Sequence, residues 1–177
     1  MTEKIKVNFI VAVGKQNQIG LNGKVPWMDD PSFSEIVKLD MINFRGLTKN
    51  TVCVCGYNTY PSVKHIKGTL HRKLIIDQED IHGYLYRKWD DYYPFEYAKY
   101  KNSVDPTFPL TVSIIGGNKT YERYFKHMRY LNEIFGFNNI EVFKTIIPYD
   151  GPADTYFTGD SYNFPTTTFD LTHLTVN

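Results

Sequence analysis

Two spacings of hydrophobic and polar positions alternate along the chain, and they predict where strands and helices lie. Continuous apolar runs, typical of strands buried on both faces, occupy residues 7–13 (VNFIVAV), 51–55 (TVCVC), 73–76, 111–115 (TVSII) and 140–147. Helices are predicted between them, over residues 32–44, from Thr59, over 95–101 and from Asn118. Strands that alternate with helices are typical of a mostly parallel sheet flanked by helices, so we predict one α/β domain over residues 1–177.

Two of the predicted helices begin with capping signals. Ser32 is followed three residues later by Glu35, and this pair predicts a capping box at the start of the first helix. Asn58 is placed to cap the short helix from Thr59, where Pro61 is tolerated in the first turn.

Charge and hydropathy exclude several classes of partner. The chain carries 20 Lys and Arg against 19 Asp and Glu, a formal net charge of +1. Binding to nucleic acid or to an anionic membrane relies on an excess of positive charge, so we predict neither. No apolar run is long enough to span a bilayer, and residues 1–6 are polar, with no signal-peptide core behind them.

The two cysteines, Cys53 and Cys55, lie two residues apart in a predicted strand and therefore share a face. A disulfide across one intervening strand residue has poor geometry. His65 and His71, the nearest histidines, stand at no recognised metal-site spacing. We predict buried free thiols, no metal site and a reducing, cytoplasmic location.

Asp40 interrupts an apolar stripe on the first predicted helix. Ile36, Val37, Met41 and Phe44 share its face of the helix. Burial disfavours a charged carboxylate, so the pKa of Asp40 should rise unless the side chain has partners. The stripe fits a functional acid, a structural acid satisfied by the backbone or an ion pair, or a rotated helix with Asp40 at its rim. Spacing alone leaves these three open.

Glycines end two predicted strands directly before helix starts. Gly56 follows TVCVC, and Gly116-Gly117 follow TVSII. A helix N-terminus is suited to a phosphate, and two such ends on one parallel sheet suit a dinucleotide, although glycine also simply ends strands. Residues 117–120 are no P-loop, because Asn118 stands where that motif has glycine.

The polar segment 14–25 follows the first strand and ends at Pro26-Trp27. A long loop at this place is typical of a lid over a site, or of an ordinary surface connection.

Six segments, in order and at matching spacing, resemble the dihydrofolate reductase family. They are FIVAVGKQNQIGLNGKVPW (9–27), LDMINF (39–44), TVCVCGYNTYPSV (51–63), HRKLII (71–76), IIGGNKTYE (114–122) and ADTYF (153–157). The resemblance implies a three-layer sandwich and reduction of 7,8-dihydrofolate to 5,6,7,8-tetrahydrofolate by hydride transfer from NADPH. It further implies a cytoplasmic monomer that serves one-carbon and thymidylate metabolism and binds antifolate inhibitors.

The resemblance also assigns pterin contacts. Asp40 matches the acid that hydrogen-bonds the pterin's amino group and ring nitrogen, Thr145 the threonine that backs it, and Trp27 the tryptophan that holds a water. Arg72 matches the arginine that pairs with the α-carboxylate of the folate glutamate, a task suited to a bidentate fork. The apolar walls would be formed by Ile10, Val11, Ala12, Met41, Phe44 and Val63.

For the cofactor, the resemblance places Ile115 and Tyr121 beside the nicotinamide, with a cis peptide at Gly116–Gly117. The other cofactor contacts would be Ala12, Ile19, Gly20, Gly56, Tyr57, Asn58, Thr59, Gly116, Gly117, Asn118 and Lys119. The family usually has Arg or Lys just after the first glycine, against the 2′-phosphate of NADPH. Tyr57-Asn58 occupy that place and offer no cation for the 2′-phosphate, so either NADPH or NADH remains possible as the cofactor.

The end of the chain departs from the family as well, which usually finishes with two antiparallel strands. The residues after 157 have room for one full strand, so we expect a shortened end.

Two other functions remain as alternatives. A related reductase of another pterin or of a pyrimidine would not need the pair of Asp40 and Arg72, which this sequence has. A non-catalytic binding or structural protein would lose Asp40, Trp27 or the Gly–Gly turn, and all are present.

Overall fold

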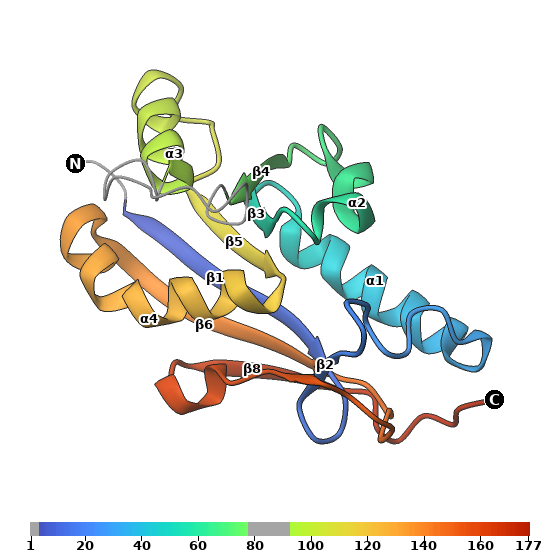
Figure 1. The fold of residues 1–177 in the computed structure, drawn as a ribbon. Coiled ribbons are helices and arrows are strands. Elements are labelled where there is room, and N and C mark those ends of the chain that lie inside the picture. The colour runs from blue at the N-terminus through green and yellow to red at the C-terminus, as the bar shows by residue number, and fades with distance from the viewer. Residues whose placement is uncertain (1–3, 78–92) are drawn as a thin grey trace.

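Parallel strands form the central sheet of this computed structural model, which describes residues 4–77 and 93–177 (Figure 1). The sheet has six strands in the order β4-β3-β5-β1-β6-β8, and each neighbouring pair runs parallel. Their bounds are β1 (Ile5–Val13), β3 (Val52–Gly56), β4 (Lys73–Asp77), β5 (Thr111–Gly116), β6 (Phe137–Ile146) and β8 (Thr166–Asp170). The short strands β2 (Gln18–Gly20) and β7 (Thr155–Tyr156) form a separate antiparallel pair.

Helices cover both faces of the sheet. Their bounds are α1 (Ser34–Thr48), α2 (Tyr60–Val63), α3 (Tyr93–Val104) and α4 (Asn118–Phe135), with short 3-10 helices η1 (Pro31–Phe33), η2 (Lys64–Ile66) and η5 (Gly159–Tyr162). The α3 and α4 helices pack on one face, and α1 and α2 on the other. The predicted α/β class, a mostly parallel sheet in a three-layer sandwich, is therefore confirmed.

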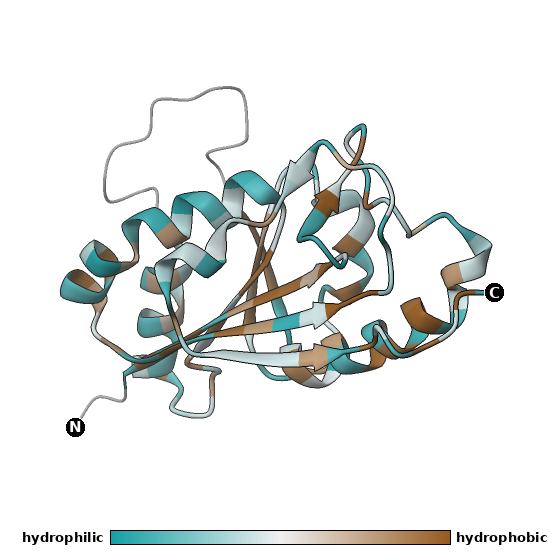
Figure 2. Cartoon of the chain, turned by 90° about the horizontal axis from the view of Figure 1, so that it is seen from below, coloured by the Kyte–Doolittle hydropathy of each residue, from teal (hydrophilic) through white to brown (hydrophobic). Residues whose placement is uncertain are grey.

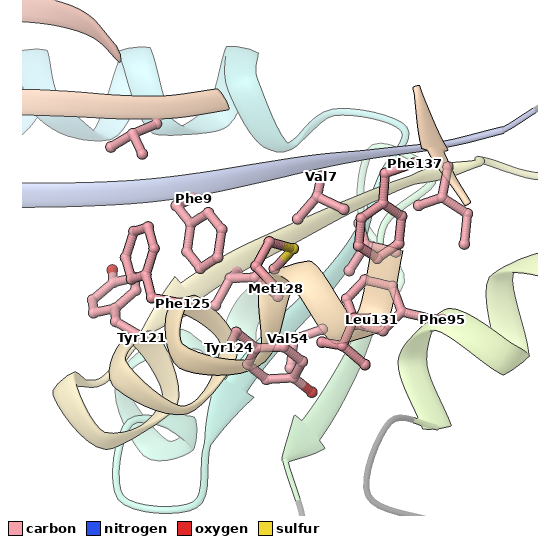
Figure 3. Packing of buried hydrophobic residues seen from close by; sticks show 14 of the residues in the cluster. Val7, Phe9, Val54, Phe95, Tyr121, Tyr124, Phe125, Met128, Leu131 and Phe137 are labelled. Atoms are coloured by element: carbon pink, nitrogen blue, oxygen red, sulfur yellow. The ribbon is translucent and has the colours of Figure 1, made fainter. Parts of the chain in front are cut away.

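Alternation along β1 explains why both faces are apolar. Val7 and Phe9 point to the α3–α4 side (Figure 3). There the Phe9 ring stacks on the ring of Phe125 in α4, with centroids 3.9 Å apart. Ile10 points to the opposite side and packs with Phe44 of α1. Much of the hydrophobic colour in Figure 2 lies along the central strands, whereas hydrophilic residues make up much of the helices. The apolar runs of the sequence are thus central strands buried from two sides.

The predicted start of the first helix is wrong. The Asp30 side chain accepts the backbone N–H of Ser32 at 3.0 Å and caps η1, and α1 begins two residues later, at Ser34, with no side-chain cap. No capping box forms, because Ser32 is itself capped by Asp30 and lies within the preceding turn. The helix continues past the predicted Phe44 to Thr48, whose hydroxyl donates back to the carbonyl of Phe44 at 2.8 Å.

The cap assigned to Asn58 is also wrong. The short helix α2 begins at Tyr60, and Thr59 takes the capping position without a side-chain hydrogen bond. The cause is a turn after β3, in which the Thr59 amide donates to the carbonyl oxygen of Gly56 at 3.2 Å. This turn displaces the helix start by one residue. The helix predicted over 95–101 is confirmed within the longer α3.

The tail contributes one strand. β8 pairs in parallel with β6 from Thr166 to Asp170, and Leu171 directly after it is buried in a cluster with Trp27, Phe33 and Ile36. The end of the described chain therefore packs behind the start of α1 and the end of the 14–27 segment.

The two thiols are free and buried, as predicted. Burial is the main reason that the pKa of Cys55 is raised to about 12, and the nearby Cys53 and Asp77 act in the same direction. Within residues 4–77 and 93–177, no helix combines the length and apolar character needed to cross a bilayer.

Candidate active site

A cavity of about 730 Å³ opens where the carboxyl ends of the central strands meet α1 and the start of α4. The predicted site residues that line it are Ile10, Val11, Ala12, Ile19, Gly20, Trp27, Asp40, Met41, Phe44, Asn58, Thr59, Val63, Ile115, Gly116, Gly117, Asn118, Lys119, Tyr121 and Thr145. The carboxyl edge of a parallel sheet is where ligands bind in open α/β folds. The structure thus brings together residues from seven separate stretches of the chain.

Asp40 lies in the wall of this cavity and is only 7% exposed. Burial raises the pKa of its carboxyl from 3.8 to about 6, and a hydrogen bond from Thr145 acts in the opposite direction. Among the residues the structure describes, Asp40 has no ion-pair partner. A position of Asp40 at the rim of a rotated helix is therefore excluded, and so is a structural ion pair with any residue that the structure describes.

Trp27 is almost completely buried and packs its ring against Tyr149, with centroids 5.6 Å apart. Its indole Nε1, a donor only, is buried and meets no acceptor among the described residues. Because Trp27 also lines the cavity, this N–H is suited to bond a polar atom of a molecule held there.

Tyr121 of α4 lies close to Asp40, but its hydroxyl hydrogen is used in another bond. Its hydroxyl donates to the carbonyl oxygen of Ile10 at 2.6 Å. Burial is the main reason that the pKa of this phenol lies far above its ordinary value, and the negative charge of the Asp40 carboxylate raises it further. Tyr121 is therefore a neutral tyrosine that ties α4 to β1 at the cavity wall.

The turn from β5 into α4 forms a close-fitting cradle. The Gly116–Gly117 peptide is cis, as expected. A Cβ on Gly117 would lie 2.9 Å from Oγ1 of Thr59, and one on Gly116 would lie 3.3 Å from the Tyr121 hydroxyl. Gly117 precedes α4 without a side-chain cap, so no side chain takes the first amides of this 18-residue helix.

These features fit a nicotinamide dinucleotide. Unpaired amides at a helix N-terminus bind phosphate, and glycine lets the ligand approach the backbone closely. Asn58, Thr59 and Lys119 also line the cavity. No group of three or more His, Cys, Asp or Glu side chains suited to a metal exists in the described parts of the chain.

Gly56, Tyr57 and Arg72 were predicted for the site but do not line the cavity. Tyr57 is half exposed. Arg72 is nearly buried, and its guanidinium donates to Oγ1 of Thr48 at 3.0 Å, to the carbonyl of Thr69 at 3.0 Å and to the Thr69 hydroxyl. The pairing of Arg72 with a substrate carboxylate stays a prediction.

Segment 14–27 contributes to the cavity lining. Its Asn22 amide donates to Oδ2 of Asp154 at 2.9 Å, and the Asp154 amide donates to the carbonyl of Gly20 at 2.9 Å. These bonds accompany the pairing of β2 with β7 and bring Thr155 to the wall. The ability of this segment to move as a lid stays a prediction.

Several further lining residues were missing from the predicted site, namely Gly23, Lys24, Val25, Met28, Val37, Asn43, Ser62, His65 and Thr155. Asn43 had a usable signal, because it follows Asp40 by three residues on the same helix and so shares its face. Thr155 lies in the segment ADTYF of the resemblance, which assigned it no contact, and the pairing of β2 with β7 brings it near Gly20.

Known proteins share this sequence pattern. The sequence model of the dihydrofolate reductase family matches residues 6–157. A curated relative, dihydromethanopterin reductase of Methylorubrum extorquens, is 28% identical over 159 residues, which cover 86% of this chain and 90% of the relative. The family match spans the cavity-lining segments from β1 to β7.

Proposed function

Because the chain belongs to the dihydrofolate reductase family, we propose that it reduces 7,8-dihydrofolate to 5,6,7,8-tetrahydrofolate. At the coarser level, the family and the relative are both reductases of the folate or pterin type. The observation that carries the proposal is Asp40, a buried carboxyl with a hydrogen bond from Thr145 in the wall of a large apolar cavity.

The Asp40 carboxylate can accept the hydrogen bonds that a pterin ring donates. An amino group and an adjacent ring N–H donate in parallel, and one carboxylate accepts both bonds. The apolar side chains of Ile10, Phe44 and Ile115, which line the same cavity, would pack against the ring and keep water from it. Asp40 therefore anchors and polarises the pterin.

The remaining chemistry is divided between cofactor and protein. A reduced nicotinamide dinucleotide, when bound, supplies the hydride for pterin C6, and a proton is added at N5. The start of α4, Thr59 and Lys119 would hold its phosphates. The unpaired indole N–H of Trp27 would hold the water that delivers the proton, so Asp40 is not the direct donor.

Cofactor choice and cellular context form part of the same proposal. NADPH is the proposed cofactor, with Lys119 in the first turn of α4 as the cation for its phosphates. The assay with NADH tests the alternative cofactor. The product would serve one-carbon and thymidylate metabolism, in a cytoplasmic monomer that antifolates inhibit.

A second candidate is reduction of a dihydropterin that lacks a glutamate tail. The observation that favours it is Arg72, which lies outside the cavity lining with three of its N–H groups bonded to Thr48 and Thr69. The relative named dihydromethanopterin reductase is in keeping with a substrate range in the family beyond dihydrofolate.

The test follows the loss of reduced-nicotinamide absorbance with dihydrofolate or with tail-less 7,8-dihydropterin, using NADPH or NADH, with and without an antifolate. We expect Asp40→Asn to lower kcat/KM by about 100-fold or more. Asp105→Asn, an exposed position after α3, is the matched control. Absence of oxidation with every pair by folded protein, or full turnover by Asp40→Asn, would refute the proposal.

A further inference from the structure

Asn43 lies one helical turn after Asp40 on α1 and lines the same cavity. Its Nδ2 donates to Oγ1 of Thr145, on β6, at 3.4 Å. Thr145 in turn hydrogen-bonds the Asp40 carboxyl. The Thr145 hydroxyl thus lies between an amide donor and a carboxyl acceptor.

The direction of these bonds follows from what each group carries. A hydroxyl has one hydrogen and two lone pairs. When the amide of Asn43 donates to a lone pair, the hydrogen of Thr145 remains for Asp40. The flipped amide would instead accept that hydrogen and leave Asp40 without it. Only the first orientation satisfies an ionised Asp40, and it is the orientation that the structure has.

Other titratable groups do not replace this bond. Lys24, His65 and Lys119 line the cavity, but among the described residues none of them forms an ion pair or hydrogen bond with Asp40. From α4, Tyr121 lies close to Asp40, yet its hydroxyl donates to Ile10. Among the residues that the structure describes, the Thr145 hydroxyl is therefore the side chain that donates to the buried Asp40 carboxyl.

We propose that Asn43 is a positioning residue that holds the Thr145 hydroxyl with its hydrogen toward Asp40, and so favours the ionised anchor for the pterin. The inference rests on the proposed function for the role of that anchor. It makes the anchor a chain of three residues, Asn43, Thr145 and Asp40, in place of a pair.

The test is a ¹³C NMR titration of the Asp40 carboxyl in the ligand-free protein, with the signal assigned by its loss in Asp40→Asn. Asn43→Leu keeps the volume and removes the donor. We expect its titration midpoint to rise by about half a pH unit, as the loss of a weak hydrogen bond implies. Thr145→Val should raise the midpoint at least as much. In the Thr145→Val background, Asn43→Leu should add nothing, because Asn43 acts through that hydroxyl.

An unchanged midpoint in folded Asn43→Leu, or an equal shift in the Thr145→Val background, would overturn the inference. Ile42→Gln, at a 68% exposed position on the same helix, controls for substitution on α1 and should leave the midpoint unchanged. Should Asn43→Leu not fold, Asn43→Ala makes the same measurement without a bulky side chain.

The titration needs no substrate, so the two proposals fail separately. A shifted midpoint in a protein that reduces no dihydropterin supports the network and refutes the proposed function. An unshifted midpoint in an active enzyme refutes the network alone. In the active enzyme, kcat/KM should decrease as pH drops below the midpoint, where Asp40 becomes protonated, and this decrease should begin at higher pH in Asn43→Leu by the same amount as the midpoint rises.

Discussion

The hydroxyl of Tyr121 donates a 2.6 Å hydrogen bond to the carbonyl oxygen of Ile10. The bond joins α4 to β1, and both residues line the cavity. The Tyr121 ring packs edge-on against Phe157, with centroids 5.8 Å apart. One side chain therefore fixes the first turn of α4 to β1, and both elements line the cavity.

Tyr121→Phe should destabilise the fold by about 1 to 2 kcal/mol, because it leaves a buried carbonyl without its donor. The phenylalanine ring keeps the contact with Phe157, so packing is retained. Urea unfolding at neutral pH measures the change. Tyr130→Phe, on the exposed side of α4, is the matched control and should stay within about 0.5 kcal/mol of the parent. Equal effects at the two positions would contradict the role of the Ile10 bond.

Asp40→Asn should stabilise the protein at alkaline pH and not at acidic pH. Burial raises the pKa of Asp40 from 3.8 to about 6, so the folded state holds a proton that the unfolded state releases first. Stability contributed by this proton is complete below pH 3.8 and is lost as pH rises through about 6. The loss above that window is about 2 to 3 kcal/mol.

Urea unfolding of Asp40→Asn and of the parent at pH 8 and at pH 4 measures this difference. The free energy of unfolding should rise in the variant at pH 8 by about 2 kcal/mol more than at pH 4. A difference that is the same at both pH values would show that the folded carboxyl is not shifted.

Gly117→Ala should weaken binding of a nicotinamide dinucleotide by about tenfold or more, since 1.4 kcal/mol of steric cost gives a factor of ten. The added Cβ would meet Oγ1 of Thr59 at 2.9 Å. Quenching of protein fluorescence on addition of NADPH or NADH gives the dissociation constant. Gly46→Ala, inside α1 with nothing within 4 Å of its added Cβ, is the matched control. It should stabilise by up to about 1 kcal/mol and leave binding unchanged.

Asp154→Ala should loosen segment 14–27. Oδ2 of Asp154 accepts the amide of Asn22 at 2.9 Å, while its Oδ1 accepts the hydroxyl of the adjacent Thr155 at 3.0 Å. Hydrogen exchange at the Asn22 amide should become faster, because the amide loses its acceptor. Asp170→Ala removes a carboxylate that caps only its own turn at Thr172 and should leave that amide unaffected. Unchanged exchange in Asp154→Ala would show that the β2–β7 pairing holds the segment alone.

Much of the sheet could be predicted because β1, β3 and β5 are buried on both faces, which leaves uninterrupted apolar runs. The helix starts were harder. Asp30 competes for the turn that Ser32 was expected to cap, and a turn after Gly56 displaces the start of α2. Capping depends on the local path of the backbone, which single-residue preferences do not specify.

In the candidate site, the apolar stripe identified Asp40 and the resemblance supplied Thr145 and Trp27. The resemblance could not say that the guanidinium of Arg72 would be bonded to Thr48 and Thr69 outside the cavity lining. It included Thr155 in the segment ADTYF but assigned it no contact, and the pairing of β2 with β7 is what brings this residue to the wall.

By itself, the sequence determined the fold class, the family and the placement of an acid within an apolar stripe of the first helix, because periodicity and ordered motifs are properties of the chain read in one dimension. Tertiary structure alone decided that Asp40 is buried without an ion pair among the described residues, and that Asn43 and Thr145 stand in one chain of hydrogen bonds with it. The physical reason is that burial and hydrogen bonding depend on which segments meet. Those contacts are made between α1 and β6, about a hundred residues apart in sequence.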